Sequence, residues 1–248
     1  MRPLLPALAL IVALPAAAQT PETPMSERER SALHAEIRAY LLANPEILNE
    51  MIAILEQKQQ AETAEKDRTL VATHAQAIFD DGFSFVGGNP DGAFTIVEFL
   101  DYQCGFCRRA HPDVAELLAS DGDIRWIVKE MPILGPGSEL AARAAVATLI
   151  AEGPERYAAL NDRLMRLQGQ VDDASLDKAL AEAGLDAAAI RARLHDPEVT
   201  RRLEATRALA DDLAISGTPT FVFENQMVRG YLPLAEMRGL VEELRASN

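Results

Sequence analysis

The chain contains only two cysteines among 248 residues, which excludes a small fold held together by several disulfides. Positive charge is also scarce: 24 lysine and arginine residues stand against 38 aspartate and glutamate residues, giving a formal net charge of −14. Such an acidic chain repels nucleic acid phosphates, and no basic stripe interrupts it, so we expect no nucleic-acid partner. The hydrophobic content of 48% is ample for a core, and the length fits one enlarged domain with an appendage.

Long apolar runs are also absent after the N-terminus, so we expect a soluble mature protein. The N-terminus has the charged start Met1-Arg2-Pro3, an apolar stretch from Leu4 to Leu14 and the small residues Ala16, Ala17 and Ala18, an order typical of a secretory signal. We expect residues 1–18 to be removed as a signal peptide; an uncleaved anchor is the alternative. Export would place the cysteines in a compartment where disulfides form, which we expect to be a bacterial periplasm.

The two cysteines lie together in the sequence C-G-F-C at residues 104–107, directly after the apolar run Thr95 to Leu100. A disulfide that closes so short a loop removes little chain entropy, so the spacing favours chemistry over stabilisation. The apolar run predicts a mostly buried strand. The residues from Cys107 to Leu118 carry apolar side chains on one helical face, and they predict a helix that ends near Gly122.

Cys104 is therefore expected at the N-terminus of this helix. Unpaired backbone N–H groups and the positive end of the helix dipole favour a thiolate there, and they can lower a cysteine pKa from about 8.5 to between roughly 3.5 and 7.5. Ionised Cys104 would be the nucleophile that attacks a disulfide. Cys107 lies one helical turn further along the same side and would resolve the mixed disulfide. The pair predicts thiol–disulfide exchange.

Three features follow one another along the chain: the cysteine pair at a helix start, Pro112 within that helix, and Thr218-Pro219 before a predicted strand from Thr220 to Glu224. In this order they resemble the thioredoxin-fold superfamily and, more closely, the DsbA-like exported oxidoreductases. The resemblance covers roughly residues 81–248. It implies that Pro219 is a cis-proline packed against the cysteines, and that Thr218 and Pro219 bind an extended substrate peptide.

Glu98, six residues before Cys104, matches the buried acidic residue that these proteins keep beneath the active site. The resemblance implies a proton-handling role for Glu98. Lys129, in the predicted strand Arg125 to Met131, is its candidate partner. Because the register of the strand is open, a glutamate that simply faces solvent is the alternative.

We expect residues 19–80 to form a helical extension outside the thioredoxin core. After a linker from Gln19 to Pro24, the segment from Ser26 to about Phe79 is helical by pattern; it begins with a capping box, and Asn44-Pro45 interrupts it. Its two apolar stripes need a surface to cover them. They consist of Leu33, Ile37, Tyr40 and Leu41, and of Leu48, Met51, Ile52 and Leu55. We expect a homo-oligomer formed through residues 26–79; a helical hairpin packed on its own chain is the alternative.

A second helical block, at about residues 139–214, is cut by glycine and proline into about four helices. It resembles the helical insertion of DsbA-like proteins, and a strand from Met227 to Tyr231 and a helix from Leu234 to Arg245 complete the fold. We therefore predict an α/β protein with a thioredoxin fold and a DsbA-like helical insertion, preceded by the N-terminal helical extension. Residues 81–248 would be the catalytic domain.

Gly105 and Phe106 between the cysteines, and Thr218 before Pro219, distinguish branches of this family. DsbA-type oxidases typically have Pro-His and Val at these places, whereas DsbC-type isomerases have Gly-Tyr and Thr. With its extension, the chain resembles the ScsC-like branch, whose members can oligomerise and shuffle wrong disulfides. This favours an isomerase or reductase for exported cysteine-containing proteins, kept reduced by a DsbD-type membrane partner. A DsbA-type oxidase with a DsbB-type partner is the alternative.

A copper carrier is a third and less favoured function. Thiolates at C-x-x-C spacing can hold Cu(I), and ScsC-like proteins are linked to copper tolerance. No Met-rich or His-rich tract accompanies the cysteines, and His111 is expected to be an ordinary helix residue. We therefore predict no metal site and no cofactor.

Overall fold

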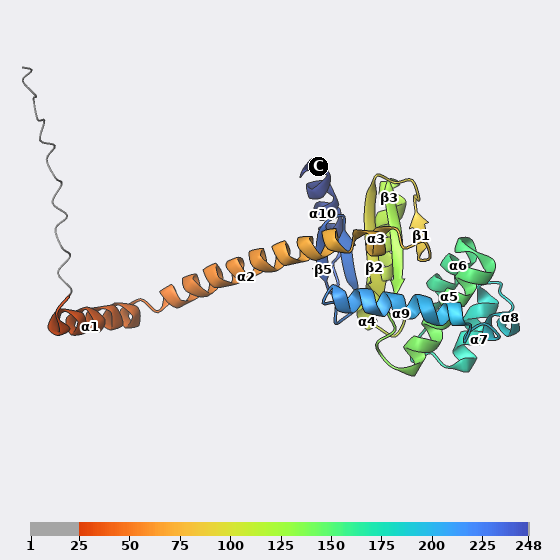
Figure 1. Ribbon diagram of the computed structural model, residues 1–248, viewed down its shortest axis with the longest axis horizontal. Coiled ribbons are helices and arrows are strands. Elements are labelled where there is room, and N and C mark those ends of the chain that lie inside the picture. Colours follow the sequence, from red (N-terminus) through yellow and green to blue (C-terminus); the bar gives the residue numbers. More distant parts are fainter. Residues whose placement is uncertain (1–24, 248) are drawn as a thin grey trace, which may run out of the picture. The chain divides into compact units, whose positions relative to one another are not determined.

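The computed structural model describes residues 25–247. The predicted signal peptide, residues 1–18, and the linker up to Pro24 lie outside the described residues. The chain divides into two compact units, one up to Gln57 and one from Lys58 onward. Figure 1 gives the order of the elements along the chain.

The first unit contains α1 (Glu27–Ala43) and the beginning of α2 (Glu46–Thr73). The predicted capping box starts α1: Glu29 N–H donates to the Ser26 hydroxyl over 3.4 Å, and Ser26 N–H donates to the Glu29 carboxylate over 2.9 Å. Asn44 caps the end of α1, and the interruption before α2 falls at Asn44-Pro45 as predicted. No residue of α1 is buried. Both apolar stripes lie exposed in the described chain: Leu33, Ile37, Tyr40 and Leu41 on α1, and Leu48, Met51, Ile52 and Leu55 on α2.

The second unit is built on a five-stranded sheet in the order β1-β3-β2-β4-β5. Its strands are β1 (Phe85–Gly88), β2 (Phe94–Leu100), β3 (Ile124–Glu130), β4 (Thr220–Phe223) and β5 (Gln226–Arg229). Only β2 and β3 are parallel; α4 (Gly105–Asp121) connects them, and the other neighbours are antiparallel. The sheet therefore has its central strand, β2, leading directly into α4.

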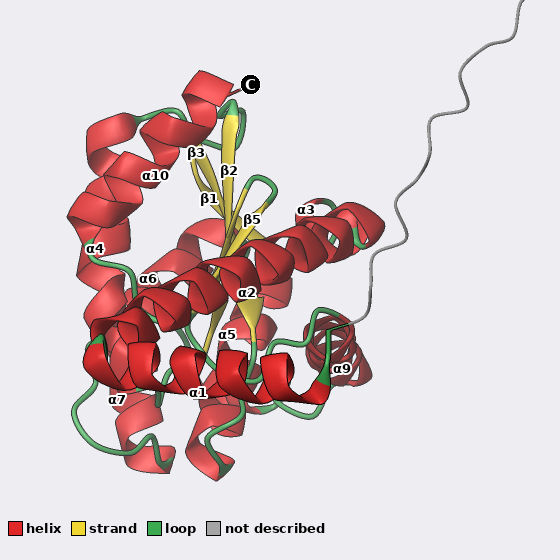
Figure 2. Ribbon diagram, turned by 90° about the vertical axis from the view of Figure 1, so that its left-hand side faces the viewer, coloured by secondary structure: helices red, strands yellow, loops and turns green. Residues whose placement is uncertain are grey.

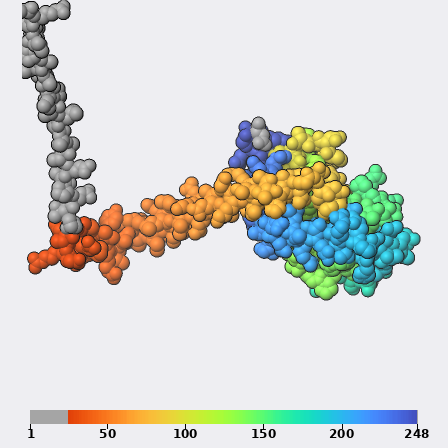
Figure 3. All heavy atoms as spheres, in the orientation of Figure 1, coloured from red at the N-terminus to blue at the C-terminus, as the bar shows by residue number. Residues whose placement is uncertain are grey.

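Alternating residues of β2 face two different hydrophobic cores, as the pleat of a strand requires. Ile96 and Leu100 face a core that includes α4 and α10 (Leu234–Ser247). Val97 and Phe99 face a core closed by the end of α2, by α3 (Ala75–Phe79) and by α9 (Pro197–Asp212). Figure 2 shows α4 and α10 on one side of the strands and α3 and α9 on the other, and Figure 3 shows α9 beside the segment around α3 on the surface. The sheet is covered on both faces.

The helical block between β3 and β4 has five helices in the fully described segment 136–212, not about four. They are α5 (Pro136–Glu152), α6 (Pro154–Met165), α7 (Asp173–Glu182), α8 (Ala187–Arg191) and α9. The additional helix is α8, which starts because the Asp186 carboxylate accepts hydrogen bonds from Ala188 N–H and Ala189 N–H. In Figure 1, α5 to α8 gather to the right of the strands.

Strand β1 was not predicted, because its two glycines indicate a turn. In the structure they permit close approach of β1 to β3. A Cβ on Gly88, whose φ is +66°, would lie 2.4 Å from the carbonyl oxygen of Ile124, and a Cβ on Gly87 would lie 3.2 Å from the ring of Trp126. The predicted elements around the cysteines, and the last strand and helix, are confirmed within one to two residues. Among the described helices, none combines the length and apolarity needed to cross a membrane.

Candidate active site

Cys104 is the N-cap residue of α4, at the point where the chain leaves the end of β2. Cys104 N–H donates to the Asp101 carbonyl over 3.0 Å, so the turn from strand to helix is hydrogen bonded. Both thiols are free; Cys104 is 7% exposed, whereas Cys107 is completely buried in the first turn of the helix. Pro112 lies inside α4 as the sequence suggested. Of the two sulfurs, Cys104 is therefore the one that solvent and a substrate disulfide can reach.

The Thr218-Pro219 peptide bond is cis, and its loop lies against the cysteines. The Cys104 sulfur lies 3.1 Å from the Thr218 carbonyl oxygen, to which the protonated thiol donates a hydrogen bond. This proximity follows from strand pairing: Thr220, the first residue of β4, lies opposite Phe99 near the end of β2. The structure thus brings together residues more than a hundred positions apart in sequence.

The two thiols differ strongly in their readiness to ionise. The pKa of Cys104 is lowered to about 5, first by a hydrogen bond from the Cys107 thiol and then by the Thr218 side chain and the backbone N–H groups of Cys107 and Phe106, although burial opposes the shift. Burial raises the pKa of Cys107, and hydrogen bonding to Cys104 and the charge of Glu98 raise it further. At neutral pH the site holds one thiolate and one thiol.

Glu98 is buried beneath the cysteines and is 2% exposed. Its carboxylate accepts a hydrogen bond of 3.1 Å from the indole N–H of Trp126. Burial raises the pKa of Glu98 to about 8, and the Trp126 hydrogen bond opposes that shift. The solvent-facing alternative is therefore wrong, and Glu98 is a protonated acid near neutral pH.

Lys129 does not pair with Glu98, so this expectation is wrong. In the parallel register Glu98 lies opposite Val128, which places Lys129 on the other face of the sheet. There the Lys129 ammonium donates to the Asp81 carboxylate over 2.6 Å and to the Ala77 carbonyl over 2.8 Å. The lysine attaches the segment after α3 to the sheet.

Asp101 was not singled out in the sequence, yet it connects two loops at the site. One carboxylate oxygen accepts from the backbone N–H groups of Ile133 and Leu134 over 2.8 and 3.1 Å; the other accepts from Gln103 N–H and the Ser138 hydroxyl, each over 2.7 Å. The loop that carries Cys104 and the loop after β3 are thereby held to the same buried side chain. The sequence did offer one signal for this residue, because Asp101 directly follows the apolar strand that leads to the cysteines.

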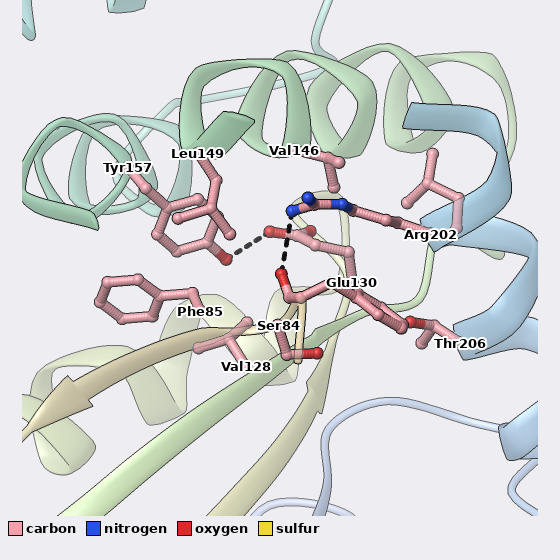
Figure 4. Close-up of a pocket in the computed structure, with 11 residues that line it drawn as sticks. Ser84, Phe85, Val128, Glu130, Val146, Leu149, Tyr157, Arg202 and Thr206 are labelled. Atoms are coloured by element: carbon pink, nitrogen blue, oxygen red, sulfur yellow. Dashed lines mark hydrogen bonds between the residues drawn. The ribbon is translucent and has the colours of Figure 1, made fainter. Parts of the chain in front are cut away.

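A third buried acid, Glu130, closes a polar cluster behind the site. The hydroxyls of Tyr102 and Tyr157 donate to one carboxylate oxygen over 2.7 and 2.5 Å, and the Asn161 amide donates to the Tyr102 hydroxyl over 3.1 Å. Burial raises the pKa of Glu130 to about 8. Figure 4 shows Tyr157 pointing from α6 to Glu130 beside a small cavity of about 20 Å³, near Arg202 of α9. The cluster fixes Tyr102, two residues before Cys104.

Phe106 extends from the loop between the cysteines and is 59% exposed. Among the described residues 58–247, the other large apolar side chains with comparable exposure are Ile133 and Leu134, in the loop held by Asp101. A side chain on Gly105 would meet open space, so packing does not demand glycine there. No group of three or more His, Cys, Asp or Glu residues in the described chain is arranged to hold a metal ion.

A family model described as "DSBA-like thioredoxin domain" matches residues 95–242, more than half of the chain. The chain belongs to this family. A second model, described as "Copper resistance protein ScsC N-terminal domain", matches residues 29–62, which lie in α1 and α2. The resemblance predicted from the cysteines, Pro112, Thr218 and Pro219 is confirmed, as is the thioredoxin-like fold with a helical N-terminal region.

Solved structures agree with the assignment to the DsbA-like family. A thioredoxin-like oxidoreductase from Silicibacter pomeroyi is 36% identical, over 69% of this chain and 97% of that chain, with a TM-score of 0.65. A linker-deletion variant of Proteus mirabilis ScsC is 25% identical, over 92% of this chain and 100% of that chain, with a TM-score of 0.68. The thiol-disulfide exchange protein alpha-DsbA2 from Wolbachia pipientis is 27% identical, over 74% and 98%, with a TM-score of 0.69.

Curated relatives of this DsbA-like chain include the Na(+)/H(+) antiporter NhaA 3 of Salinispora tropica, which is 29% identical over 147 residues. The alignment spans 58% of this chain and 22% of the antiporter. The chain thus spans about a fifth of the length of such relatives.

Replacing Cys107 with alanine is expected to raise the pKa of Cys104 above about 5, because the variant loses the thiol that donates the largest stabilising hydrogen bond to the thiolate. The ultraviolet absorbance of the thiolate, followed during a pH titration, measures this shift. Cys104→Ala is the matched control, and its remaining thiol should stay protonated at neutral pH. An unchanged Cys104 titration in C107A would contradict the interpretation.

Glu98→Gln is expected to flatten the loss of stability as the pH rises from about 4.5 to about 8. In this range unfolded Glu98 ionises while folded Glu98, with its pKa raised to about 8, stays protonated, so ionisation favours unfolding. The difference in the free energy of unfolding between wild type and E98Q should change by up to about 1.4 kcal/mol per pH unit. Urea unfolding at several pH values measures it, with the exposed Glu152→Gln as control. Parallel curves for E98Q and wild type would exclude this titration.

Proposed function

We propose that this chain exchanges thiols and disulfides with cysteine-containing exported proteins through Cys104 and Cys107. The observation that carries the proposal is the free pair at the start of α4, where Cys104 has a pKa of about 5 and Cys107 stays protonated. Ionised Cys104 attacks a substrate disulfide, and Cys107 resolves the mixed disulfide and releases the substrate. The membership in the DsbA-like family supports this assignment.

The neighbouring residues have defined places in this reaction. Thr218 and Pro219 offer the cis-proline loop to an extended substrate segment beside Cys104. Gly105 leaves the approach to Cys104 open, and Phe106 presents an apolar ring to the substrate. Glu98, whose charged form raises the pKa of Cys107, is the buried acid that exchanges the proton of that thiol during the reaction.

The favoured direction is isomerase or reductase. An isomerisation begins from the reduced enzyme, in which the Cys104 thiolate is the nucleophile. A stabilised thiolate also makes the oxidised pair a stronger oxidant, so the pKa of Cys104 is compatible with either direction. The residues that favour an isomerase, by resemblance, are Gly105, Phe106 and Thr218. The reaction then needs a DsbD-type membrane reductase and a periplasmic location reached through the signal peptide, residues 1–18; a DsbB-type partner belongs to the oxidase alternative. Copper carriage is least favoured, because the two thiols have no further ligand cluster near them in the described chain.

We propose that residues 26–79 join copies of the chain into a homo-oligomer. The apolar stripes of α1 and α2 are exposed in the single chain, and burying them is favourable. The match of residues 29–62 to the ScsC N-terminal model supports this assignment. The oligomer would place several reactive thiols around one misfolded substrate.

Reduced protein is expected to restore activity to a substrate protein with scrambled disulfides when oxygen is absent. Cys104→Ser should abolish the recovery, while Cys107→Ser should accumulate mixed disulfides because the resolving thiol is missing. Recovered substrate activity and non-reducing gels measure the two effects. If the reduced protein fails here but its oxidised form rapidly oxidises a reduced substrate, the oxidase alternative is correct.

Replacing Leu48 and Leu55 together with glutamate is expected to convert the full chain to a monomer, since charge on the apolar stripe opposes its burial. Sedimentation measures the molecular mass in solution. Gln59→Glu adds a negative charge to an exposed polar position of the same helix and should leave the oligomer intact. A wild-type chain that sediments as a monomer contradicts the proposed assembly.

A further inference from the structure

A hollow of about 580 Å³ lies beside the reactive thiol, between the first turns of α4 and the end of α6. It begins at Gly105, the residue next to Cys104, and a Cβ at that position would meet open space. The same hollow is lined by Arg108, Arg109 and Arg166. Three guanidinium groups thus line a hollow that begins one residue away from Cys104.

Two of these arginines are held in place without a neutralising acid. Arg108 Nε donates to the Tyr102 carbonyl over 2.7 Å and Nη1 donates to the Gly169 carbonyl over 3.1 Å, while the Arg109 guanidinium lies 4.4 Å from the centre of the Tyr231 ring. None of the ion pairs among residues 25–247 includes Arg108 or Arg109. Their charges remain available to a ligand.

The third arginine is partly neutralised. Arg166 Nε donates to the Asp162 carboxylate over 2.8 Å, and the His111 ring lies 3.1 Å from the same oxygen. One acid is thus shared by two basic groups, and the hollow as a whole keeps an excess of positive charge. In a chain with a net charge of −14, this concentration beside the nucleophile gives the site a local charge opposite to that of the protein.

We propose that the hollow binds carboxylate side chains that flank the reacting cysteine of a substrate polypeptide. The inference rests on the proposed thiol–disulfide exchange and names the class of segment that this exchange prefers. Arginine is suited to the task because its planar guanidinium matches a carboxylate with two parallel hydrogen bonds. The rest of the protein is acidic and repels carboxylate-bearing segments. The hollow is therefore the surface to which such a segment is attracted.

The hollow contributes binding and takes no part in the bond changes. The Cys104 thiolate attacks one sulfur of the substrate disulfide and forms a new S–S bond with it; the old S–S bond breaks, and the other sulfur leaves as a thiolate that takes up a proton from water. No electrons enter from outside, because one disulfide replaces another. Arginines 108, 109 and 166 hold the flanking carboxylates while this exchange occurs.

Two peptides test the proposal. Each has one cysteine joined through a disulfide to a neutral pyridinethiol, and they differ only in glutamate or lysine on both sides of that cysteine. The absorbance of released pyridinethione gives the rate constant for attack by the reduced protein. At low salt the glutamate peptide should react about three- to tenfold faster than the lysine peptide, and the ratio should approach one in about 1 M salt because the charges are screened.

Charge-reversal variants localise the effect. Arg109→Glu and Arg166→Glu should each lower the ratio of the two rates. Arg163→Glu is the control: it is an exposed change of equal charge near the end of α6, it does not line the hollow, and it should keep the wild-type ratio. Thermal unfolding of each variant verifies that it is folded. Equal rates for the two peptides in wild type, or the same ratio in R109E, R166E and R163E, would overturn the proposal.

The peptides also separate this inference from the proposed function. If the wild-type protein reacts with both peptides at the same rate, thiol–disulfide exchange is supported and the preference for acidic segments is contradicted. A wild-type protein with intact thiols that reacts with neither peptide contradicts the exchange itself, and the preference falls with it.

Discussion

The pairing of β2 with its two neighbours is the constraint that produces the site. On one side Phe99 lies opposite Thr220, which brings the Thr218-Pro219 loop beside the turn that carries Cys104. On the other side Glu98 lies opposite Val128, which directs its carboxyl toward the buried cysteine and the Trp126 ring. Because side chains alternate along a strand, a shift of one residue in either pairing would place these groups on opposite faces.

The acids around the cysteines are buried to different effect. Asp101 accepts four hydrogen bonds and holds two loops together, whereas Glu98 accepts one and stays protonated near neutral pH. Glu130, with two tyrosine hydroxyls on one oxygen, is also protonated there and fixes the backbone behind the site. An uncompensated carboxylate in such surroundings would cost several kcal/mol, about the net stability of many domains. Asp101 therefore tolerates burial because its carboxylate is fully hydrogen bonded, whereas Glu98 and Glu130 tolerate it because they are protonated.

Local sequence patterns were sufficient for the strand before Cys104, the helix after it and the capping box at Ser26, because periodicity and capping chemistry act over a few residues. The cis form of the bond before Pro219 came from resemblance, since most X-Pro bonds are trans. The predicted pairing of Lys129 with Glu98 was wrong, because the sequence of a single strand does not determine its register with its neighbours. Asp101, Trp126 and the arginines of the hollow gain their roles from segments far away in the chain, so no local pattern identified them.

The contact between Trp126 and Glu98 gives the molecule an internal optical signal. Trp126 is the single tryptophan of the chain, and its indole N–H is bonded to the acid that lies beneath Cys107. Indole emission responds to the electric field across the ring, and the nearest buried charge that can appear or vanish belongs to Glu98. Ionisation of that acid, or a change in the thiols above it, would therefore alter the fluorescence of the unlabelled protein.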